Sequence, residues 1–332
     1  MTDHPVSAYQ SAAMTSSKSA KSRSKSSRRQ PAPALLPAHP PVFLTAPDWP
    51  DFALLDTGNG RKLERYGERT LVRPEPQALG TCALPEEQWL SADAVFTGND
   101  DEDGAGRWKY GPSLSEIWPL SYRNVRFLGR FTAFRHVGLF PEQASHWDFM
   151  RGEIALSTRP FRLLNLFGYT GVASLVAAAA GAEVTHVDAS KKAIGWAREN
   201  QALSKMEKLP IRWICDDARK FVEREGRRGR TYDGILVDPP KFGRGPKGEV
   251  WNLFDDLPPL IDACALILSE RARFLILTAY AIRASFYSLD VLMRERLAGH
   301  GGMVRSGELV LPVGRSGRSL STSLYSRWTR DP

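Results

Sequence analysis

Three acidic residues stand where their carboxylates could bind a nucleoside. Asp188 ends an apolar run, and a carboxylate at that place can accept hydrogen bonds from both hydroxyls of a ribose. Asp216 and Asp217 follow the next apolar run, and either could accept from the amino group of adenine. Simpler roles are open as well, since Asp188 could stabilise a helix dipole and Asp217 could be a helix N-cap. Together the three acids indicate an adenosine-containing ligand.

The loop Asn165–Gly171 (NLFGYTG) narrows the choice of ligand. A dinucleotide fingerprint reads Gly-x-Gly-x-x-Gly, because a pyrophosphate needs close access to the backbone, and here only Gly168 and Gly171 are present. S-adenosylmethionine has no phosphate, and its methionine arm needs one close approach of the backbone. Phe167 and Tyr169 would help to wall its pocket. The loop therefore favours S-adenosylmethionine over NAD.

The segment Asp238-Pro239-Pro240-Lys241-Phe242 is the candidate for chemistry. Two prolines stiffen the turn, Asp238 or a neighbouring carbonyl can accept from an exocyclic amine, and Phe242 offers a ring face to a flipped base. Methyl transfer is an in-line displacement from a sulfonium, so catalysis can come from placing a nucleophile about 3 Å from the methyl carbon. Asp-Pro-Pro alone is also an ordinary strand end, and the acids that precede it favour the functional interpretation.

Alternating strand and helix patterns position these residues. We expect strands at 161–167, 183–188, 211–215, 232–240 and 273–280, helices at 170–181, 190–205, 217–225, 256–269 and 285–299, and two final short strands at 307–312 and 323–328. The order predicts an α/β fold, a Rossmann-like doubly wound sheet with an antiparallel hairpin at its C-terminal edge. The acids then lie at the carboxyl ends of the strands, where such sheets bind ligands.

The chain before this sheet divides into two parts. Residues 1–47 carry six basic residues and one acidic residue, and thus +5 of the formal charge of +8, in a Ser, Pro and Ala background that predicts a disordered tail. Residues 48–130 are strand-like, with a hairpin signal at Gly58-Asn59-Gly60, and predict a small β-rich domain. Residues 131–332 form the third part. The tail could add weak attraction to nucleic acid or have no role.

Composition excludes several protein classes. The 332 residues include 42% hydrophobic and 25% charged residues, and no apolar run approaches the roughly 20 residues that cross a bilayer. Cys82, Cys215 and Cys264 lie far apart with no Cys-x-x-Cys pair, so neither zinc nor a redox dithiol is indicated. A protein of the reducing cytoplasm, without a metal, is expected.

The motifs LNLFGYTG, HVDAS, DDARKF and VDPPKF resemble those of class I S-adenosylmethionine-dependent methyltransferases. They are most similar to the ribosomal RNA large-subunit methyltransferases of the RlmI and RlmK type. The first loop of that family reads Asn-x-Phe-x-Tyr-Thr-Gly, and its fourth strand ends in Asp-Pro-Pro-x-Phe. The similarity covers residues 138–328 and includes GLFPEQASHW, which resembles a Phe/Tyr-x-Asp-Gln-Arg element, with Glu142 in place of Asp.

The strand ends and the resemblance together imply a set of site residues. Those expected to hold the cofactor are Gln143, Asn165, Phe167, Gly168, Tyr169, Thr170, Gly171, Asp188, Ala189, Asp216, Asp217 and Ala218. Those expected at the reaction are Asp238, Pro239, Pro240 and Phe242. Those expected to hold RNA phosphates are Lys241, Arg244, Arg315 and Arg318.

The resemblance implies methylation of a base in ribosomal RNA, and a small-molecule or protein substrate, or a binding module without catalysis, stays open. Formation of 5-methylcytosine needs a thiolate. In RlmI-like relatives that thiol is expected just after the fifth strand, where this chain has Thr278, Ala279 and Tyr280. We therefore expect an N-methylated base, a purine by analogy with RlmK-like relatives.

Overall fold

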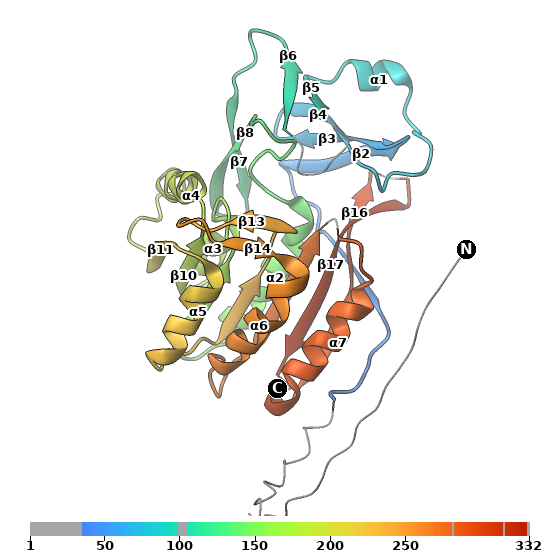
Figure 1. The fold of residues 1–332 in the computed structure, drawn as a ribbon. Coiled ribbons are helices and arrows are strands. Elements are labelled where there is room, and N and C mark those ends of the chain that lie inside the picture. Colours follow the sequence, from blue (N-terminus) through green and yellow to red (C-terminus); the bar gives the residue numbers. More distant parts are fainter. Residues whose placement is uncertain (1–34, 99–104, 281, 315, 331–332) are drawn as a thin grey trace, which may run out of the picture. The chain divides into compact units, whose positions relative to one another are not determined.

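The computed structural model describes residues 35–98, 105–280, 282–314 and 316–330 (Figure 1). The described strands are β1 (Val42–Thr45), β2 (Phe52–Gly58), β3 (Arg61–Tyr66), β4 (Arg69–Pro74), β5 (Ala94–Gly98), β6 (Gly106–Tyr110), β7 (Ile117–Tyr122), β8 (Val125–Arg130), β9 (Phe161–Leu166), β10 (Ala182–Asp188), β11 (Ile211–Cys215), β12 (Gly234–Val237), β13 (Phe242–Arg244), β14 (Val250–Asn252), β15 (Phe274–Tyr280), β16 (Met303–Val313) and β17 (Arg318–Thr329). The described helices are α1 (Glu86–Leu90), η1 (Pro141–Gln143), α2 (Ala144–Ala155), α3 (Val172–Ala179), α4 (Lys191–Leu203), α5 (Ala218–Arg227), α6 (Leu253–Leu266), α7 (Phe286–Arg296) and η2 (Ala298–His300).

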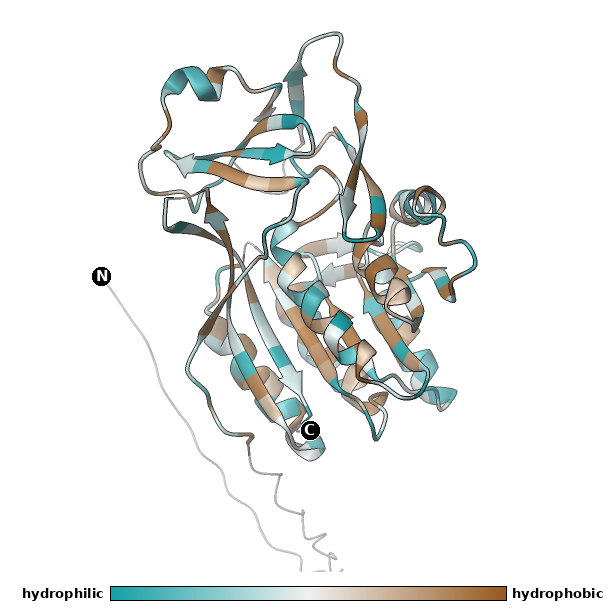
Figure 2. Ribbon diagram, turned by 180° about the vertical axis from the view of Figure 1, so that it is seen from behind, coloured by the Kyte–Doolittle hydropathy of each residue, from teal (hydrophilic) through white to brown (hydrophobic). Residues whose placement is uncertain are grey.

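A parallel sheet with the order β11-β10-β9-β12-β15 forms the centre of the C-terminal half. Its inner strands are almost continuous apolar runs, as expected when helices cover both faces (Figure 2). Because β9 has β10 on one side and β12 on the other, the strand order reverses at β9. The carboxyl end of β9 is thus the switch point at which open α/β sheets bind ligands.

Two helical layers cover this sheet. Helices α5, α6 and α7 pack side by side on one face (Figure 1), and α2, α3 and α4 pack in sequence on the other. Each layer encloses its own cluster of buried apolar side chains, which include Leu260 and Leu275 in the first and Leu163 and Leu175 in the second. The alternation of strands and helices predicted from residue 161 onward is confirmed by these elements.

Side-chain caps explain where several helices begin. The Ser190 hydroxyl accepts a hydrogen bond from the Ala193 N–H at the start of α4, as the sequence predicts. The Asp217 carboxylate accepts from the Lys220 N–H at the start of α5. Each cap satisfies one of the backbone donors that a helix leaves free in its first turn. Both caps thereby fix a helix start at the carboxyl edge of the sheet.

The C-terminal strands β16 and β17 pair antiparallel, and β17 lies between β15 and β16. The sheet does not stop there, because β16 also pairs with β1 and, through Val313 and Leu54, with β2. From β2 the sheet continues through β3, β4, β5 and β6. A register shift at Leu309/Val310 marks a bulge in the hairpin. One sheet thus connects the N-terminal strands to the C-terminal ones.

The N-terminal strands share a core with the helical layers. The cluster that contains Leu163 and Leu175 also contains Trp49, Trp118 and Phe127. Trp49 contacts Trp147 of α2 at a ring-centroid distance of 5.9 Å. The described residues, from 35 to 330 with their gaps, consequently belong to one compact unit.

The expected tail is shorter than the sequence reasoning places it. Residues 42–45 form β1 and pair with β16, and Leu36 is buried with its carbonyl accepting from the Arg294 guanidinium. These contacts correct the boundary of the tail at residue 47, because the backbone of β1 pairs with β16 and the Leu36 side chain packs into a core cluster, although Val42 and Phe43 are exposed. Residues 1–34, which contain the six basic residues, lie outside the described part of the chain. Among the described helices, none is long and apolar enough to cross a membrane.

Candidate active site

A cleft of about 1330 Å³ lies at the carboxyl ends of β10, β11 and β12. A smaller pocket of about 70 Å³ adjoins it, since Phe140, Gln143, Phe167, Tyr169 and Asp238 line both. Of the predicted cofactor residues, Phe167, Tyr169, Asp188, Ala189, Asp216, Asp217, Ala218 and Gln143 line the cleft, Asn165, Gly168 and Thr170 line the pocket, and Gly171 lines neither. The fold therefore brings together residues that lie far apart in the chain.

The loop after β9 has a strained backbone. Phe167 and Tyr169 adopt left-handed φ angles of 57° and 50°, which cost free energy in residues with a side chain. Gly171 has a φ of 80° and is the N-cap of α3. A Cβ atom on Gly168 would lie 2.3 Å from the His186 ring. Such strain concentrates at functional sites, and here it turns the rings of Phe167 and Tyr169 into the cleft and pocket.

Asp188 ties that loop to the start of α4. Its Oδ2 accepts from the Tyr169 N–H at 2.8 Å, and its Oδ1 accepts from the Ser190 N–H at 2.8 Å. Burial raises the pKa of the carboxyl, and the two backbone N–H groups oppose that rise. Because a carboxylate oxygen can accept two hydrogen bonds, each oxygen keeps one free position at the cleft.

The adjacent acids after β11 differ in their partners. Asp216 accepts from the Asp217 N–H through Oδ1 and from the Arg224 guanidinium through Oδ2 at 2.5 Å. Asp217 uses Oδ1 to cap α5, and its Oδ2 has no hydrogen-bond partner within the described ranges. The sequence left either acid open as the adenine acceptor. The partners favour Asp217, because it lines the cleft and keeps one carboxylate oxygen without a partner among the described residues.

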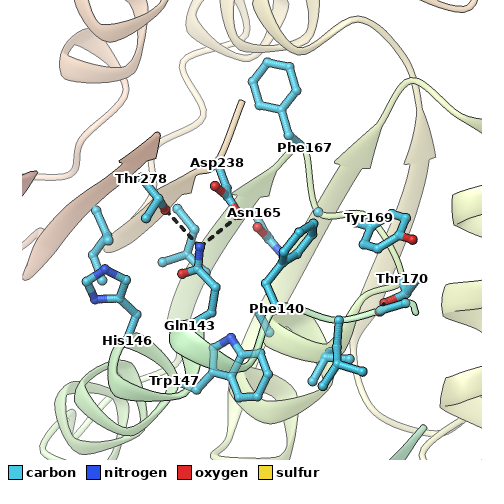
Figure 3. A pocket seen from close by; sticks show the side chains of 17 residues that line it. Phe140, Gln143, His146, Trp147, Asn165, Phe167, Tyr169, Thr170, Asp238 and Thr278 are labelled. Atoms are coloured by element: carbon cyan, nitrogen blue, oxygen red, sulfur yellow. Dashed lines mark hydrogen bonds between the residues drawn. The ribbon is translucent and has the colours of Figure 1, made fainter. Parts of the chain in front are cut away.

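Asp238 lines both the cleft and the smaller pocket, and the Gln143 side chain lies between it and Thr278 (Figure 3). The Gln143 amide donates to Asp238 Oδ2 at 3.0 Å and to Thr278 Oγ1 at 3.3 Å. Burial and the nearby Glu142 carboxylate raise the pKa of Asp238, which Thr278 opposes, and the resulting pKa is about 7. The carboxyl group thus titrates close to neutral pH.

The prolines and Phe242 are held by a small hairpin that the sequence did not predict. Strands β13 and β14 pair directly after the prolines, and the Trp251 indole donates to the Pro240 carbonyl at 2.7 Å. Trp251 also contacts the Phe167 ring, with centroids 4.9 Å apart. Phe242 is 56% exposed and lines the cleft. The hairpin therefore presents an apolar ring beside Asp238.

Two predicted cofactor residues make contacts inside the protein. The Asn165 amide donates to Ser174 Oγ at 2.9 Å, and the Thr170 hydroxyl donates to the Gly138 carbonyl at 2.5 Å. Both side chains are buried. The two side chains hold the wall of the smaller pocket in place, so only atoms outside these two hydrogen bonds can contact a ligand.

The four basic residues predicted to bind RNA phosphates lie in different parts of the structure. Lys241 and Arg244 line the cleft, as expected. Arg318 does not, because its guanidinium pairs with Asp56 at 2.6 Å and donates to the Thr81 carbonyl. Its role is to join β17 to the N-terminal strands, which corrects the sequence interpretation. Arg315 lies outside the described residues.

Sequence reasoning missed several residues of the cleft wall. Glu142 is 5% exposed and accepts from Ser323 Oγ at 3.3 Å, and burial raises its pKa. His146 lines the smaller pocket with both ring nitrogens unpaired among the described residues, and burial lowers its pKa to about 3. Tyr280 reaches the cleft from the end of β15. Glu142 and His146 belong to the GLFPEQASHW element and Tyr280 ends an expected strand, so the sequence held signals for these positions although none was assigned to the site.

The chain is similar along almost its whole length to a solved structure, the SAM-dependent methyltransferase from Agrobacterium tumefaciens. The two are 59% identical, the TM-score is 0.87, and the match covers 91% of this chain and 98% of that structure. This chain belongs to the S-adenosylmethionine-dependent methyltransferases. The α/β fold and the S-adenosylmethionine cofactor expected from the sequence are thereby confirmed. A methyltransferase solved in complex with SAH, 18% identical with a TM-score of 0.61, shares the fold.

This methyltransferase also matches curated relatives. It is 24% identical to ribosomal RNA large subunit methyltransferase K of Neisseria meningitidis, over 76% of this chain and 71% of the relative. It is 29% identical to ribosomal RNA large subunit methyltransferase K/L of Alteromonas mediterranea, over 55% of this chain. The match spans only 26% of the length of that K/L protein. The family model described as "Conserved hypothetical protein 95" matches residues 148–270.

Proposed function

We propose that this methyltransferase transfers a methyl group to a nitrogen atom of a base in ribosomal RNA. The observation that carries the proposal is that Asp188, Asp217 and Asp238, from three strand ends, line one cleft with Phe242. The names of the curated relatives support ribosomal RNA as the substrate. Lys241 and Arg244 at the cleft fit a polyanion.

The cofactor is proposed to lie between the β9 loop and the start of α5. The free positions on the two oxygens of Asp188 match a ribose diol. Asp217 Oδ2 and the N–H of Ala218, the first residue of α5, match the amino group and a ring nitrogen of adenine. When bound, S-adenosylmethionine supplies a methyl group on a positively charged sulfur, which leaves as a neutral thioether.

Asp238 is proposed to act on the acceptor. In its ionised form the carboxylate accepts a hydrogen bond from the N–H of an amine and so directs the nitrogen lone pair. When nitrogen gains the methyl group, it must release one proton, and a carboxylate with a pKa of about 7 can take it up. Pro239 and Pro240 keep the turn rigid, and Phe242 stacks on the base.

Gln143 is proposed to be a positioning residue for Asp238 rather than a direct ligand of the cofactor. Its amide nitrogen has both hydrogens engaged, one with Asp238 and one with Thr278 (Figure 3). This places the Asp238 carboxylate in one orientation. The donor also favours the ionised form of Asp238, which is the form that accepts from an amine.

We propose the domain division that the sequence predicts, with one change at the end of the basic tail. The basic tail extends to about residue 34, the β-rich part covers residues 48–130, and the methyltransferase part with its hairpin covers residues 131–332. The free cysteines at positions 82, 215 and 264 support a reducing compartment such as the cytoplasm.

Comparison of RNA from a strain that lacks this protein with RNA from its parent tests the substrate. Mass spectrometry of the nucleosides should show the loss of one N-methylated base, and purified protein should restore it to ribosomal RNA of the deficient strain. Identical nucleoside profiles, together with no methyl transfer to that RNA in vitro, would exclude ribosomal RNA and leave a protein or small molecule as substrate.

A further inference from the structure

Part of the cleft wall comes from the N-terminal side of the chain. Pro76 and Gln77 follow β4, Phe134 and His136 follow β8, and all four line the same cleft as the strand-end acids. The cleft volume of about 1330 Å³ exceeds the roughly 300–1,000 Å³ of common small-molecule sites, so there is room beyond the cofactor. The N-terminal wall therefore belongs to the substrate side of the cleft.

The segment around Phe134 is rigidly built. The Phe134 N–H donates to Thr132 Oγ1 at 3.1 Å, and the Phe134 carbonyl accepts from the Trp108 indole at 3.2 Å. Next to it, the Arg135 guanidinium donates to Tyr280 Oη at 2.7 Å, and the Arg135 carbonyl accepts from Arg73 at 3.0 Å. The backbone of Phe134 is consequently fixed before any substrate binds.

A buried ion network supports this segment from β3 and β4. Arg73 pairs with Glu64 at 2.7 Å, and Lys62 pairs with Glu75 at 3.0 Å. All four side chains are almost completely buried. Because removal of one partner would leave an unpaired buried charge, the network holds the N-terminal wall in one arrangement.

The Phe134 ring itself is not part of this packing. It is 50% exposed, and it makes no ring contact with another aromatic side chain of the described ranges. The cations Lys241, Arg244 and Arg283 line the same cleft. An exposed aromatic ring on a rigid wall, with cations in the same cleft, matches single-stranded nucleic acid, whose bases stack and whose phosphates need positive charge.

We propose that Phe134 is a stacking site for the base of a nucleotide that flanks the methylated one. The methylated base has to reach Asp238, which also lines the smaller pocket, whereas Phe134 lines only the cleft and is half exposed. The ring therefore takes a neighbouring base, and the enzyme acts on an unpaired stretch of RNA. This inference rests on the proposed RNA substrate.

Binding of single-stranded RNA to Phe134→Ala tests the proposal. The probe is a fluorescent oligoadenylate of about ten nucleotides, a length typical of single-stranded sites, with a chain of equal length that lacks bases as the second probe. Loss of one base–aromatic stack should weaken oligoadenylate binding about 5- to 160-fold. The base-free probe should bind the variant and the native protein equally, since it carries only phosphates.

Phe254→Ala is the matched control, because Phe254 of α6 is 54% exposed but does not line the cleft. Cofactor affinity, measured by calorimetry, should be native in both variants. Equal oligoadenylate affinity of the Phe134 and Phe254 variants, or an equal loss with the base-free probe, would overturn the stacking role. If the native protein bound neither probe and did not methylate RNA, the proposed function itself would fail.

Discussion

The hydrogen bond from Gln143 to Asp238 leads to a prediction about the pH dependence of methyl transfer. Gln143→Leu removes the amide that donates to Asp238 Oδ2 at 3.0 Å and keeps a side chain of similar size. A hydrogen bond to a charged group contributes about 1.5–3 kcal/mol. At 1.36 kcal/mol per pKa unit, its loss raises the pKa of Asp238 by about 1–2 units above the native value of about 7.

The sign follows from which form the donor stabilises. The Gln143 N–H favours the ionised carboxylate, so the variant holds its proton up to a higher pH. The ionised fraction at pH 7 falls from about one half to about one tenth or one hundredth, and kcat/KM at that pH should fall about 5- to 50-fold. At pH values above the new midpoint the rate should recover toward the native rate.

The assay is the initial rate of transfer of a labelled methyl group to ribosomal RNA from the deficient strain, from about two pH units below to about three above neutrality. Gln77→Leu is the control, because Gln77 lines the same cleft and has no contact with Asp238 among the described hydrogen bonds. Calorimetry should give native cofactor affinity for both variants. An unshifted pH profile of Gln143→Leu with weakened cofactor binding would refute the positioning role and restore the role expected from the sequence.

Four further predictions concern the cofactor, the buried carboxyl group, the tail and the thiols. Asp188→Ala should fold, as judged by circular dichroism, but bind S-adenosylmethionine about 1–3 kcal/mol more weakly in calorimetry, and unchanged affinity would contradict the ribose assignment. Asp238→Asn should have a higher melting temperature than the native protein, by a difference that grows from pH 5 to pH 8. The folded-state pKa of Asp238, about 7, lies above the ordinary 3.8, so the native protein loses the stability of the protonated carboxyl group as pH rises through 7. A difference in melting temperature that does not grow with pH would count against the raised pKa. Deletion of residues 1–33, which stops before the buried Leu36, should weaken RNA binding mainly at low salt and leave turnover at saturating RNA unchanged, and a loss of turnover would place the tail in the site. Methyl transfer should persist when Cys82, Cys215 and Cys264 are all replaced by Ser or Ala, because none of them lines the cleft. If the native protein makes 5-methylcytosine and the folded, cofactor-binding variant transfers no methyl group, N-methylation is disproved.

The buried ion network of β3 and β4 gave no signal in the sequence, because the cost of burying a charge depends on partners that lie elsewhere in the chain. A buried Lys62 or Glu64 reads as a solvated charge in sequence, since burial of a charge is favourable only with a partner that the chain supplies from another strand. Arg318 was misread for the same reason. It looked like a free cation on a loop, but Asp56 reaches it from across the sheet.

The placement of the acidic residues at one edge of the sheet was predictable from sequence alone, and their contact with adenosine stays a prediction. Strand-end acids and the loop Asn165–Gly171 depend on local order, because an apolar strand followed by a turn places the next residues at the carboxyl edge of a parallel sheet. Asp188, Asp217 and Asp238 accordingly line the cleft where the motifs predicted. The cap at Ser190 is local as well, since it spans one helical turn.

The acceptor side was decided by tertiary structure. Gln143 meets Asp238 across 95 residues of chain, and Arg135 meets Tyr280 across 145. Phe134 becomes a cleft residue only because β3 and β4 fix the segment that carries it. Sequence by itself determined the succession of strands and helices, the α/β class of the fold and the S-adenosylmethionine cofactor, because those follow from periodicity, local turns and local motifs, whereas the order of strands in the sheet came from the tertiary structure. Which side chains orient the reacting carboxylate, and which wall receives the substrate, depend on long-range packing that no local pattern encodes.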